Sequence, residues 1–349
     1  IQLGNERVLR ARLEDAKFFI NSDLSISSSK RNEELKRVTF ADKLGSLFDR
    51  TRRIQLVAKI LVAQLSFSET ELQELFRAAH FCKHDLVSQM VSEFPELQGL
   101  IGAKYLLAEG ESKEVSLAIL EHYLPRYAGD KLPDSKVGAA LALSERIELL
   151  LSIFAKGERP SGSSDPYALR RAGNGIMQII WSNEWTLDIN SVLDKALNDW
   201  KELLPELSIN SNALVKELAE FFRQRIISLL EESGIDIDIV QAVSGETIPI
   251  KNILADPMDI RRRAELLSHM RKSEKLISVY EVVTRASRLA SKSHLGTSIL
   301  SADEVVDPSL FEKTSESNML KILNELEPIA KSKSIERNKL MVDILASSS

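Results

Sequence analysis

Cysteine is nearly absent from this chain of 349 residues, which contains only Cys82. A single thiol excludes an intrachain disulfide and any zinc site built from several cysteines, and it is typical of a reducing compartment. Apolar runs are short as well: the stretch from Ile54 to Leu65 is interrupted by Lys59 and Gln64, so none approaches the ~20 residues that cross a bilayer. We therefore expect no membrane span, no secretory signal and a cytoplasmic location.

The patterns of common enzyme sites are also missing. The sequence has no Walker-type glycine-rich loop, no G-x-S-x-G elbow and no paired-glycine fingerprint after a strand. His122, His269 and His294 have no evident nucleophile partner in the sequence, although a triad assembled only in space stays open. We predict no catalytic residue, no metal site and no cofactor in this chain.

Strand patterns are lacking too, because apolar and polar residues nowhere alternate over a sufficient length. Helical spacing dominates instead. Apolar residues recur three and four apart from Leu72 to Phe94, after a capping-box pattern at Ser68 and Glu71, and Pro95 follows the run. A second helix is predicted from Asn212 to Glu232, before a Ser-Gly stop signal. The predicted fold class is all-α.

The charge balance gives a mixed indication. A net charge of −5 argues against general adhesion to nucleic acid. The basic residues are nevertheless clustered, and such clusters could hold phosphates locally. A solvated helix face is the alternative for each cluster. The clusters are Arg50 with Arg52 and Arg53, Arg170 with Arg171, Arg261 to Arg263, and Arg285 with Arg288.

Segments rich in helix breakers suggest how the chain is divided. The segments Gly157 to Pro166 and Gly245 to Pro257 are the best candidate boundaries, whereas the serine-rich run Ser25 to Ser29 is typical of a loop. We therefore predict three helical domains, at residues 1–165, 166–254 and 255–349.

Four blocks of sequence closely resemble the beta subunit of the bacterial-type glycyl-tRNA synthetase. Their order and spacing make the match specific. They are GNERVLRARLEDAKFF (Gly4 to Phe19), DLVSQMVSEFPELQGLIG (Asp85 to Gly102), HYLPRYAGDKLP (His122 to Pro133) and DPYALRRA (Asp165 to Ala172). The resemblance implies an HD-like helical domain with a degenerate metal site, then a helical body, then a helical anticodon-binding domain like that of arginyl-tRNA synthetase.

The resemblance also implies a role. The family joins glycine to its tRNA with ATP, and the chemistry, with ATP and Mg, resides in the alpha subunit. This chain has no recognisable class II motifs, so it is expected to bind and position tRNA(Gly) for the alpha subunit rather than to activate glycine. Because the part of the family's sequence before Gly4 is missing, the chain resembles a C-terminal portion of the beta subunit.

The block from Asp165 to Ala172 predicts a helix that starts at Pro166 with Asp165 as its N-cap. Arg170 and Arg171 would then project about 100° apart. One guanidinium could bind a phosphate while the other pairs with a carboxylate. Attachment of this helix to the first domain is the alternative role for both.

The C-terminal region provides the other candidate tRNA contacts. Arg285, Arg288 and Lys292 recur at helical spacing after Tyr280, and a basic helix face can hold an RNA backbone whose bases are splayed out. Arg262 and Arg263 complete the predicted tRNA-binding set. The segment Ile335 to Leu345 only approximates the family's closing pattern, so we expect this last domain to be incomplete or short.

A metal-dependent HD-type phosphohydrolase is the alternative function. His84 and Asp85 are adjacent as in HD sites, and His80 lies four residues earlier, the spacing of helical zinc ligands. Such a centre also needs an upstream histidine and a distal aspartate. No histidine precedes His80, and Glu145 stands near the distal position, so two expected ligands are missing or altered.

Overall fold

The computed structural model describes residues 2–292, 301–332, 340–341 and 344. These residues form helices, turns and two isolated bridges, Thr39 with Ser46 and Ser161 with Ser164, which confirms the all-α fold. The longer helices are α1 (Gln2–Leu24), α3 (Leu47–Val62), α4 (Glu69–Phe81), α8 (Lys136–Ala155), α9 (Leu169–Ser182), α10 (Ile189–Leu203), α11 (Ser211–Glu232), α14 (Pro257–Lys272), α15 (Lys275–Lys292) and α17 (Thr314–Lys331). The shorter ones are α2 (Ser28–Glu34), α5 (Gln89–Glu93), α6 (Leu100–Ala108), α7 (Lys113–Glu121), α12 (Ile237–Ser244), α13 (Ile250–Ala255) and α16 (Ala302–Val305), with 3₁₀ turns η1 (Leu35–Arg37), η2 (His84–Val87), η3 (Pro95–Leu97) and η4 (Pro308–Leu310).

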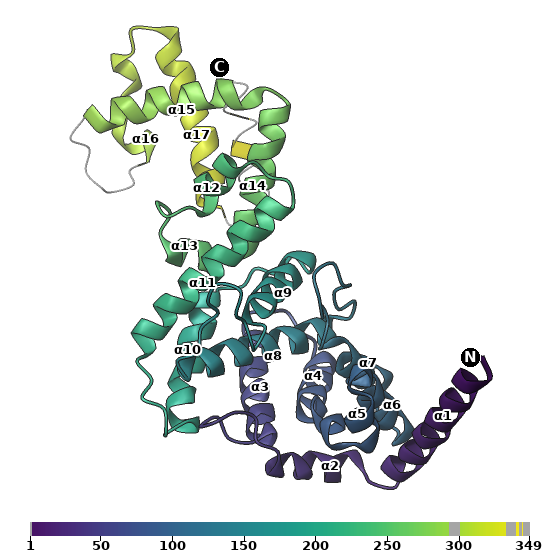
Figure 1. Cartoon of the computed structure of the whole chain (residues 1–349). Helices are drawn as coiled ribbons and strands as arrows, with labels where there is room; N and C mark the ends of the chain where they lie inside the picture. Colours follow the sequence, from purple (N-terminus) through teal and green to yellow (C-terminus); the bar gives the residue numbers. More distant parts are fainter. Residues whose placement is uncertain (1, 293–300, 333–339, 342–343, 345–349) are drawn as a thin grey trace. The chain divides into compact units, whose positions relative to one another are not determined.

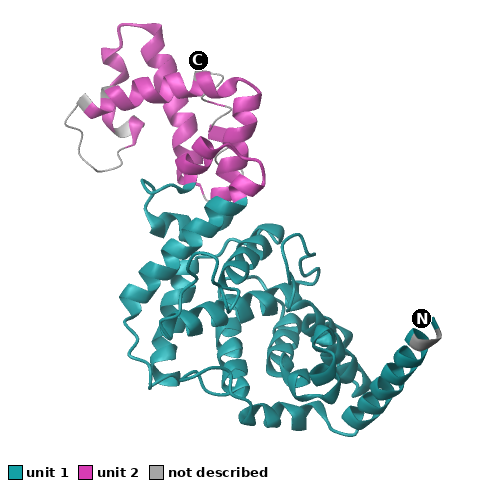
Figure 2. Ribbon diagram, viewed as in Figure 1, with its two compact units in different colours: residues 1–229, 244–258 teal, residues 230–243, 259–349 magenta. Residues whose placement is uncertain are grey.

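The chain forms two compact units, coloured separately in Figure 2. Unit 1 contains residues 1–229 and 244–258, and unit 2 contains residues 230–243 and 259–349. The division into three domains at residues 1–165, 166–254 and 255–349 stays a prediction.

Helix α8 is the central element of unit 1, and α3, α4, α7 and α9 all pack against it (Figure 1). Its sequence is apolar around nearly the whole circumference, which is typical of a helix enclosed on all sides. Ser135 caps its first turn by accepting a hydrogen bond from the backbone N–H of Gly138 at 3.0 Å. The few charged residues on α8 must therefore find their partners inside the protein.

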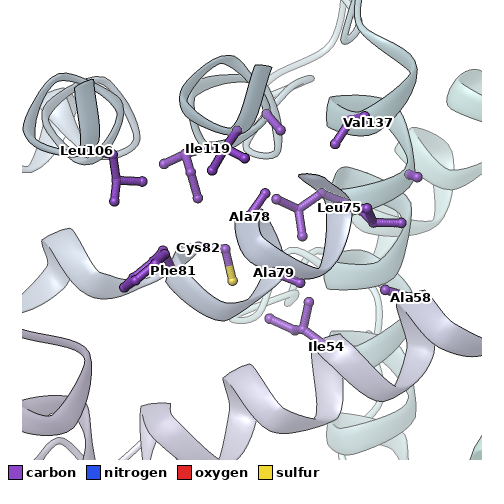
Figure 3. Packing of buried hydrophobic residues seen from close by; sticks show 14 residues of the cluster. Ile54, Ala58, Leu75, Ala78, Ala79, Phe81, Cys82, Leu106, Ile119 and Val137 are labelled. Atoms are coloured by element: carbon purple, nitrogen blue, oxygen red, sulfur yellow. The ribbon is translucent and has the colours of Figure 1, made fainter. Parts of the chain in front are cut away.

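Figure 3 shows a cluster of buried apolar side chains in unit 1, between α3, α4, α7 and α8. Ile54 and Ala58 come from α3, and Ile119 comes from α7. Leu75 and Cys82 come from α4 and its C-cap, and Cys82 is fully buried among these apolar side chains. The buried alanines allow the helix backbones to approach closely, so α4 is held firmly up to the segment that follows it.

The helix predicted from Leu72 to Phe94 is divided, so that part of the prediction is wrong. Its start is confirmed, because Ser68 and Glu71 form the capping box of α4. The helix ends at Phe81, and the chain continues through η2 before Ser88 caps the short helix α5. In η2, after the break, the side chain of Asp85 accepts a hydrogen bond from the backbone N–H of Gly99 in another segment.

Two further sequence predictions can be compared with the structure. The helix from Asn212 to Glu232 is confirmed as α11, and Gly234 after it has a φ of +83° that glycine adopts without strain. The helix predicted from Pro166 begins at Leu169 instead, after Ala168 in a left-handed conformation. Asp165 still binds the first turn of α9, accepting from the N–H groups of Leu169 at 2.7 Å and Arg170 at 3.0 Å.

Unit 2 is organised around α12, α14, α15, α16 and α17. Arg271, in the last turn of α14, donates to Asp236 at 2.8 Å and to Asp238 at 2.9 Å. The hydroxyl of Ser301 donates to Glu327 at 3.2 Å, which connects the start of α16 to α17. Within the described part of the chain, no helix is both long and apolar enough to span a membrane. Most of the segment Ile335 to Leu345 lies outside the described residues.

Candidate functional site

The His84–Asp85 pair lies in η2 and is fully buried. The Nε2 of His84 donates to the carbonyl of Gly102 at 3.2 Å, and Asp85 accepts from the N–H of Gly99 at 2.7 Å. A Cβ at position 102 would stand 3.0 Å from the Asp85 carboxylate and 3.1 Å from the Ile119 side chain, so a larger residue would make these side chains shift by a few tenths of an ångström. Burial raises the pKa of Asp85, although the Gly99 hydrogen bond opposes that shift. The pair therefore fastens η2 to α6.

His80 and His84 do not point toward a common site. Its Nε2 lies 3.2 Å from the side-chain nitrogen of Asn32, while His84 contacts Gly102. Across the residues that the structure describes, no three His, Cys, Asp or Glu side chains are grouped so that they could hold a metal ion. A hydrolytic metal centre needs several converging ligands and an open position for water. The residues present therefore do not fit the HD-type phosphohydrolase alternative.

Internal cations surround the position of the expected distal acid. Glu145 of α8 accepts from Arg50 at 2.6 Å and from Lys83 at 3.2 Å. Although burial alone would raise its pKa, the charges of Lys83 and Arg50 prevail and hold the pKa of Glu145 well below its usual value. The Nζ of Lys83 also lies 3.1 Å from Nε2 of His122. Protein side chains thus supply the positive charge that neutralises Glu145.

A second buried carboxylate lies one turn further along α8. Glu148 accepts from Arg50 at 2.8 Å, from Arg53 at 2.9 Å and from the hydroxyl of Ser152 at 2.7 Å. The prediction that Arg50 and Arg53 could hold phosphates is therefore wrong, because both guanidinium groups already pair with Glu148 of α8. Of that cluster only Arg52 is exposed.

The buried histidines should make folding sensitive to mild acid. Burial, aided by the charge of Arg31, lowers the pKa of His84 to about 3, and burial with Lys83 nearby holds the pKa of His122 well below its usual value. Their stabilising effect is complete above the unfolded pKa of about 6.5 and is lost as pH falls below it. We expect urea titrations from pH 7 to pH 5 to show a loss of up to about 1.4 kcal/mol per pH unit for each histidine.

The variant His84→Gln isolates one of these contributions. Glutamine keeps a donor for the Gly102 carbonyl but does not titrate in this range. The decline in unfolding free energy between pH 7 and pH 5 should become shallower. An unchanged slope would show that His84 is protonated equally in the folded and unfolded states.

Arg170 and Arg171 point to different sides of α9, as predicted. Arg170 lines a cavity of about 570 Å³ together with Arg159, Glu217 and Phe221. Arg171 is exposed, and its charge acts on the buried Arg146. The structure therefore does not unite the two arginines in one site.

The unit 2 candidates lie on α14 and α15. Arg263 pairs with Asp259 at 2.7 Å, and Arg262 is half-buried. Arg285 is 80% exposed, with Glu281 at 3.9 Å as its acidic neighbour. Arg288 is exposed on the next turn, and Tyr280 is 67% exposed. Lys292 ends α15, and its side chain lies outside the described residues.

Arg146, which lies on α8 and is 5% exposed, is not among the residues predicted from the sequence. Its two Nη atoms donate to four backbone carbonyls at 3.0 to 3.1 Å, those of His122, Tyr123, Pro125 and Ala142. A charged residue within an otherwise apolar helix is the signal that could have found it, since buried arginine is rare unless it is paired.

The comparisons with known proteins all indicate the same family. The family model described as "Glycyl-tRNA synthetase beta subunit" matches residues 1–245. The glycine--tRNA ligase beta subunit of Gloeothece citriformis is 42% identical over 349 residues, which are 99% of this chain and 48% of that protein. The one from Acaryochloris marina is 44% identical over 318 residues, covering 90% of this chain and 44% of that protein. The chain spans about half the length of the curated relatives it matches.

Proposed function

Because the chain belongs to the glycyl-tRNA synthetase beta subunit family, we propose that it is a non-catalytic, tRNA-binding portion of that subunit. In this proposal it positions tRNA(Gly) for ATP-dependent glycylation in the alpha subunit, so the chain is part of a ligase without carrying its active site. ATP and Mg bind to the alpha subunit, and the complex works in the cytoplasm.

The exposed basic face of α15 is the observation that carries the proposal. Arg285 and Arg288 are three residues apart on a helix, so their side chains lie within about 60° of one another around the axis. Both are exposed, and among the residues that the structure describes Glu281 alone forms an ion pair with Arg285. Guanidinium groups so exposed can contact successive phosphates, while Tyr280 offers a ring for base stacking. The match to relatives covers this region, since it extends over 99% of the chain.

The HD-like part of unit 1 acts as a scaffold in this proposal. His84 and Asp85 are fully buried, and Glu145 is neutralised by Arg50 and Lys83. These contacts leave no open coordination position of the kind that a hydrolytic metal needs. A phosphohydrolase role is therefore not favoured.

The double variant Arg285→Ala/Arg288→Ala tests the proposed RNA face. Each phosphate contact contributes about 0.7 to 0.9 to the slope of log affinity against log salt. We expect the variant to bind tRNA(Gly) at least tenfold more weakly at low salt, with a slope smaller by about 1.4 to 1.8. Fluorescence anisotropy of labelled tRNA at four salt concentrations measures both quantities.

A matched control removes the same charge elsewhere. Arg7 and Arg10 are exposed on α1, also three residues apart, and are replaced together by alanine. Affinity and salt slope should stay close to those of the unchanged chain. If both double variants weaken binding equally, net charge rather than the α15 face determines binding, and the proposed face is refuted.

A further inference from the structure

Residues 126–134 form a loop between α7 and α8, and all but the last of them belong to the sequence block His122 to Pro133. The Oδ2 of Asp130 accepts from the backbone N–H of Arg126 at 2.9 Å, and its Oδ1 accepts from that of Lys131 at 3.0 Å. The N–H of Asp130 donates in turn to the carbonyl of Tyr127 at 3.2 Å. These bonds close the tip of the loop on itself, so its conformation is defined without help from a ligand.

Both ends of the loop are held by buried charged side chains. At the first end, Arg146 donates to the carbonyls of Tyr123 and Pro125, both at 3.1 Å. At the other end, Glu121 accepts from the backbone N–H groups of Asp134 and Ser135, each at 3.1 Å. Glu121 and Arg146 are each 5% exposed. A loop fixed at both ends by buried charges presents its tip in one orientation, as binding loops on rigid scaffolds do.

The tip of the loop presents an aromatic ring beside cationic groups. Tyr127 is 59% exposed, and its ring and hydroxyl have no hydrogen bond or ring contact within the described residues. Arg126 keeps a 55% exposed side chain although it also reaches Asp130 at 3.3 Å. Lys131 is exposed as well. An immobilised, uncovered aromatic ring flanked by cations is the arrangement that proteins use to stack a nucleobase and hold its phosphate.

Arg171 of α9 belongs to the same surface. A Cβ at Gly175 would stand 2.8 Å from Nε of Arg146 and 3.5 Å from Cδ of Pro125, so this face of α9 lies against the root of the loop. Arg171 is four residues before Gly175 and therefore lies on the same face, one turn earlier. Its charge also adds to burial in lowering the pKa of Arg146. The fold thus places a predicted tRNA-binding arginine one turn along α9 from the contact with the root of the loop.

We propose that Tyr127 stacks on a nucleobase of bound RNA, while Arg126, Lys131 and Arg171 hold the neighbouring phosphates. This surface lies in unit 1, whereas the basic face of α15 lies in unit 2. It is therefore a second RNA contact, and it rests on the proposed function, since the RNA is the tRNA that the chain binds. Stacking requires only the face of a base, so the contact contributes affinity without reading sequence.

The test compares Tyr127→Ala with Tyr127→Phe and Tyr127→Trp in the full chain, with binding of labelled tRNA(Gly) as the readout. Base stacking predicts that Tyr127→Ala weakens binding about fivefold to 100-fold, while the phenylalanine and tryptophan variants stay within about twofold. Arg171→Ala should weaken binding and also reduce the salt slope by about one unit, whereas Tyr127→Ala should leave the slope unchanged. Phe18→Ala, on α1, removes an aromatic ring that is 67% exposed and serves as the matched control.

Each outcome decides between the two proposals. If the unchanged chain binds tRNA and Tyr127→Ala binds equally well, the stacking contact is refuted and the proposed function stands. If the unchanged chain binds no tRNA, both the stacking contact and the proposed function are refuted. If Tyr127→Ala leaves tRNA affinity intact but weakens capture of a purified alpha subunit, the surface is a protein interface and the inference is wrong.

Discussion

Replacing Glu148 with alanine should lower the free energy of unfolding by about 3 to 5 kcal/mol. Glu148 is fully buried and accepts from Arg50 and Arg53, whose side chains are 10% and 2% exposed. Without the carboxylate, Arg50 still pairs with Glu145, but the guanidinium group of Arg53 stays in the interior with no carboxylate partner among the described residues. Breaking a buried ion pair by removing one partner costs far more than the intact pair contributes, because the remaining charge has lost its water.

Urea unfolding monitored by circular dichroism measures this change. The matched control is Glu33→Ala, which removes an exposed carboxylate that pairs with Lys36 on the surface. Exposed pairs contribute about 0 to 1 kcal/mol, so the control should unfold almost as the unchanged chain does. A loss below about 1 kcal/mol for Glu148→Ala would mean that water or another residue compensates Arg53.

Replacing Arg146 with methionine should destabilise the chain by at least about 3 kcal/mol and also release the 126–134 loop. The guanidinium group satisfies four carbonyls, three of which lie at the root of that loop. Methionine fills similar volume but donates no hydrogen bond, and each buried carbonyl left unsatisfied costs about 1 to 3 kcal/mol.

Hydrogen exchange separates the two effects of this substitution. The amides of Arg126 and Asp130 should lose protection in Arg146→Met under conditions where the core of α8 is still protected. Arg146→Lys should be intermediate, because one ammonium group cannot reach all the carbonyls that a planar guanidinium reaches. If the loop amides exchange equally in all three proteins, Arg146 does not hold the loop.

Local sequence signals correctly predicted those features of the fold that depend on residues close together in the chain. The capping box at Ser68 and Glu71 located the start of α4, because cap and first turn are contiguous in the chain. The turn η2 that follows α4 is held by the hydrogen bond between Asp85 and Gly99, which are fourteen positions apart in the chain. Apolar spacing continued through the break, so periodicity alone predicted one long helix. The family resemblance was likewise confirmed, whereas the predicted tRNA-binding residues remain a proposal.

Contacts between distant segments explain the errors in the candidate site. Arg50 and Arg53 are three residues apart on α3, and Glu145 and Glu148 are three residues apart on α8. The sequence does not show that these two helices pack together. Without that contact, the arginines resembled surface residues. The same limit applies to Arg171, which lies one turn from Gly175, the residue of α9 that packs on Arg146 at the root of the 126–134 loop.

The central claim is that this chain binds and positions tRNA(Gly). The most direct test titrates the full chain with tRNA(Gly) and with a version altered in the anticodon, at two salt concentrations. The account predicts salt-dependent binding of both RNAs, because phosphate and stacking contacts provide most of the affinity, with a preference for the native anticodon if unit 2 reads it. No binding to either RNA at low salt would contradict the account.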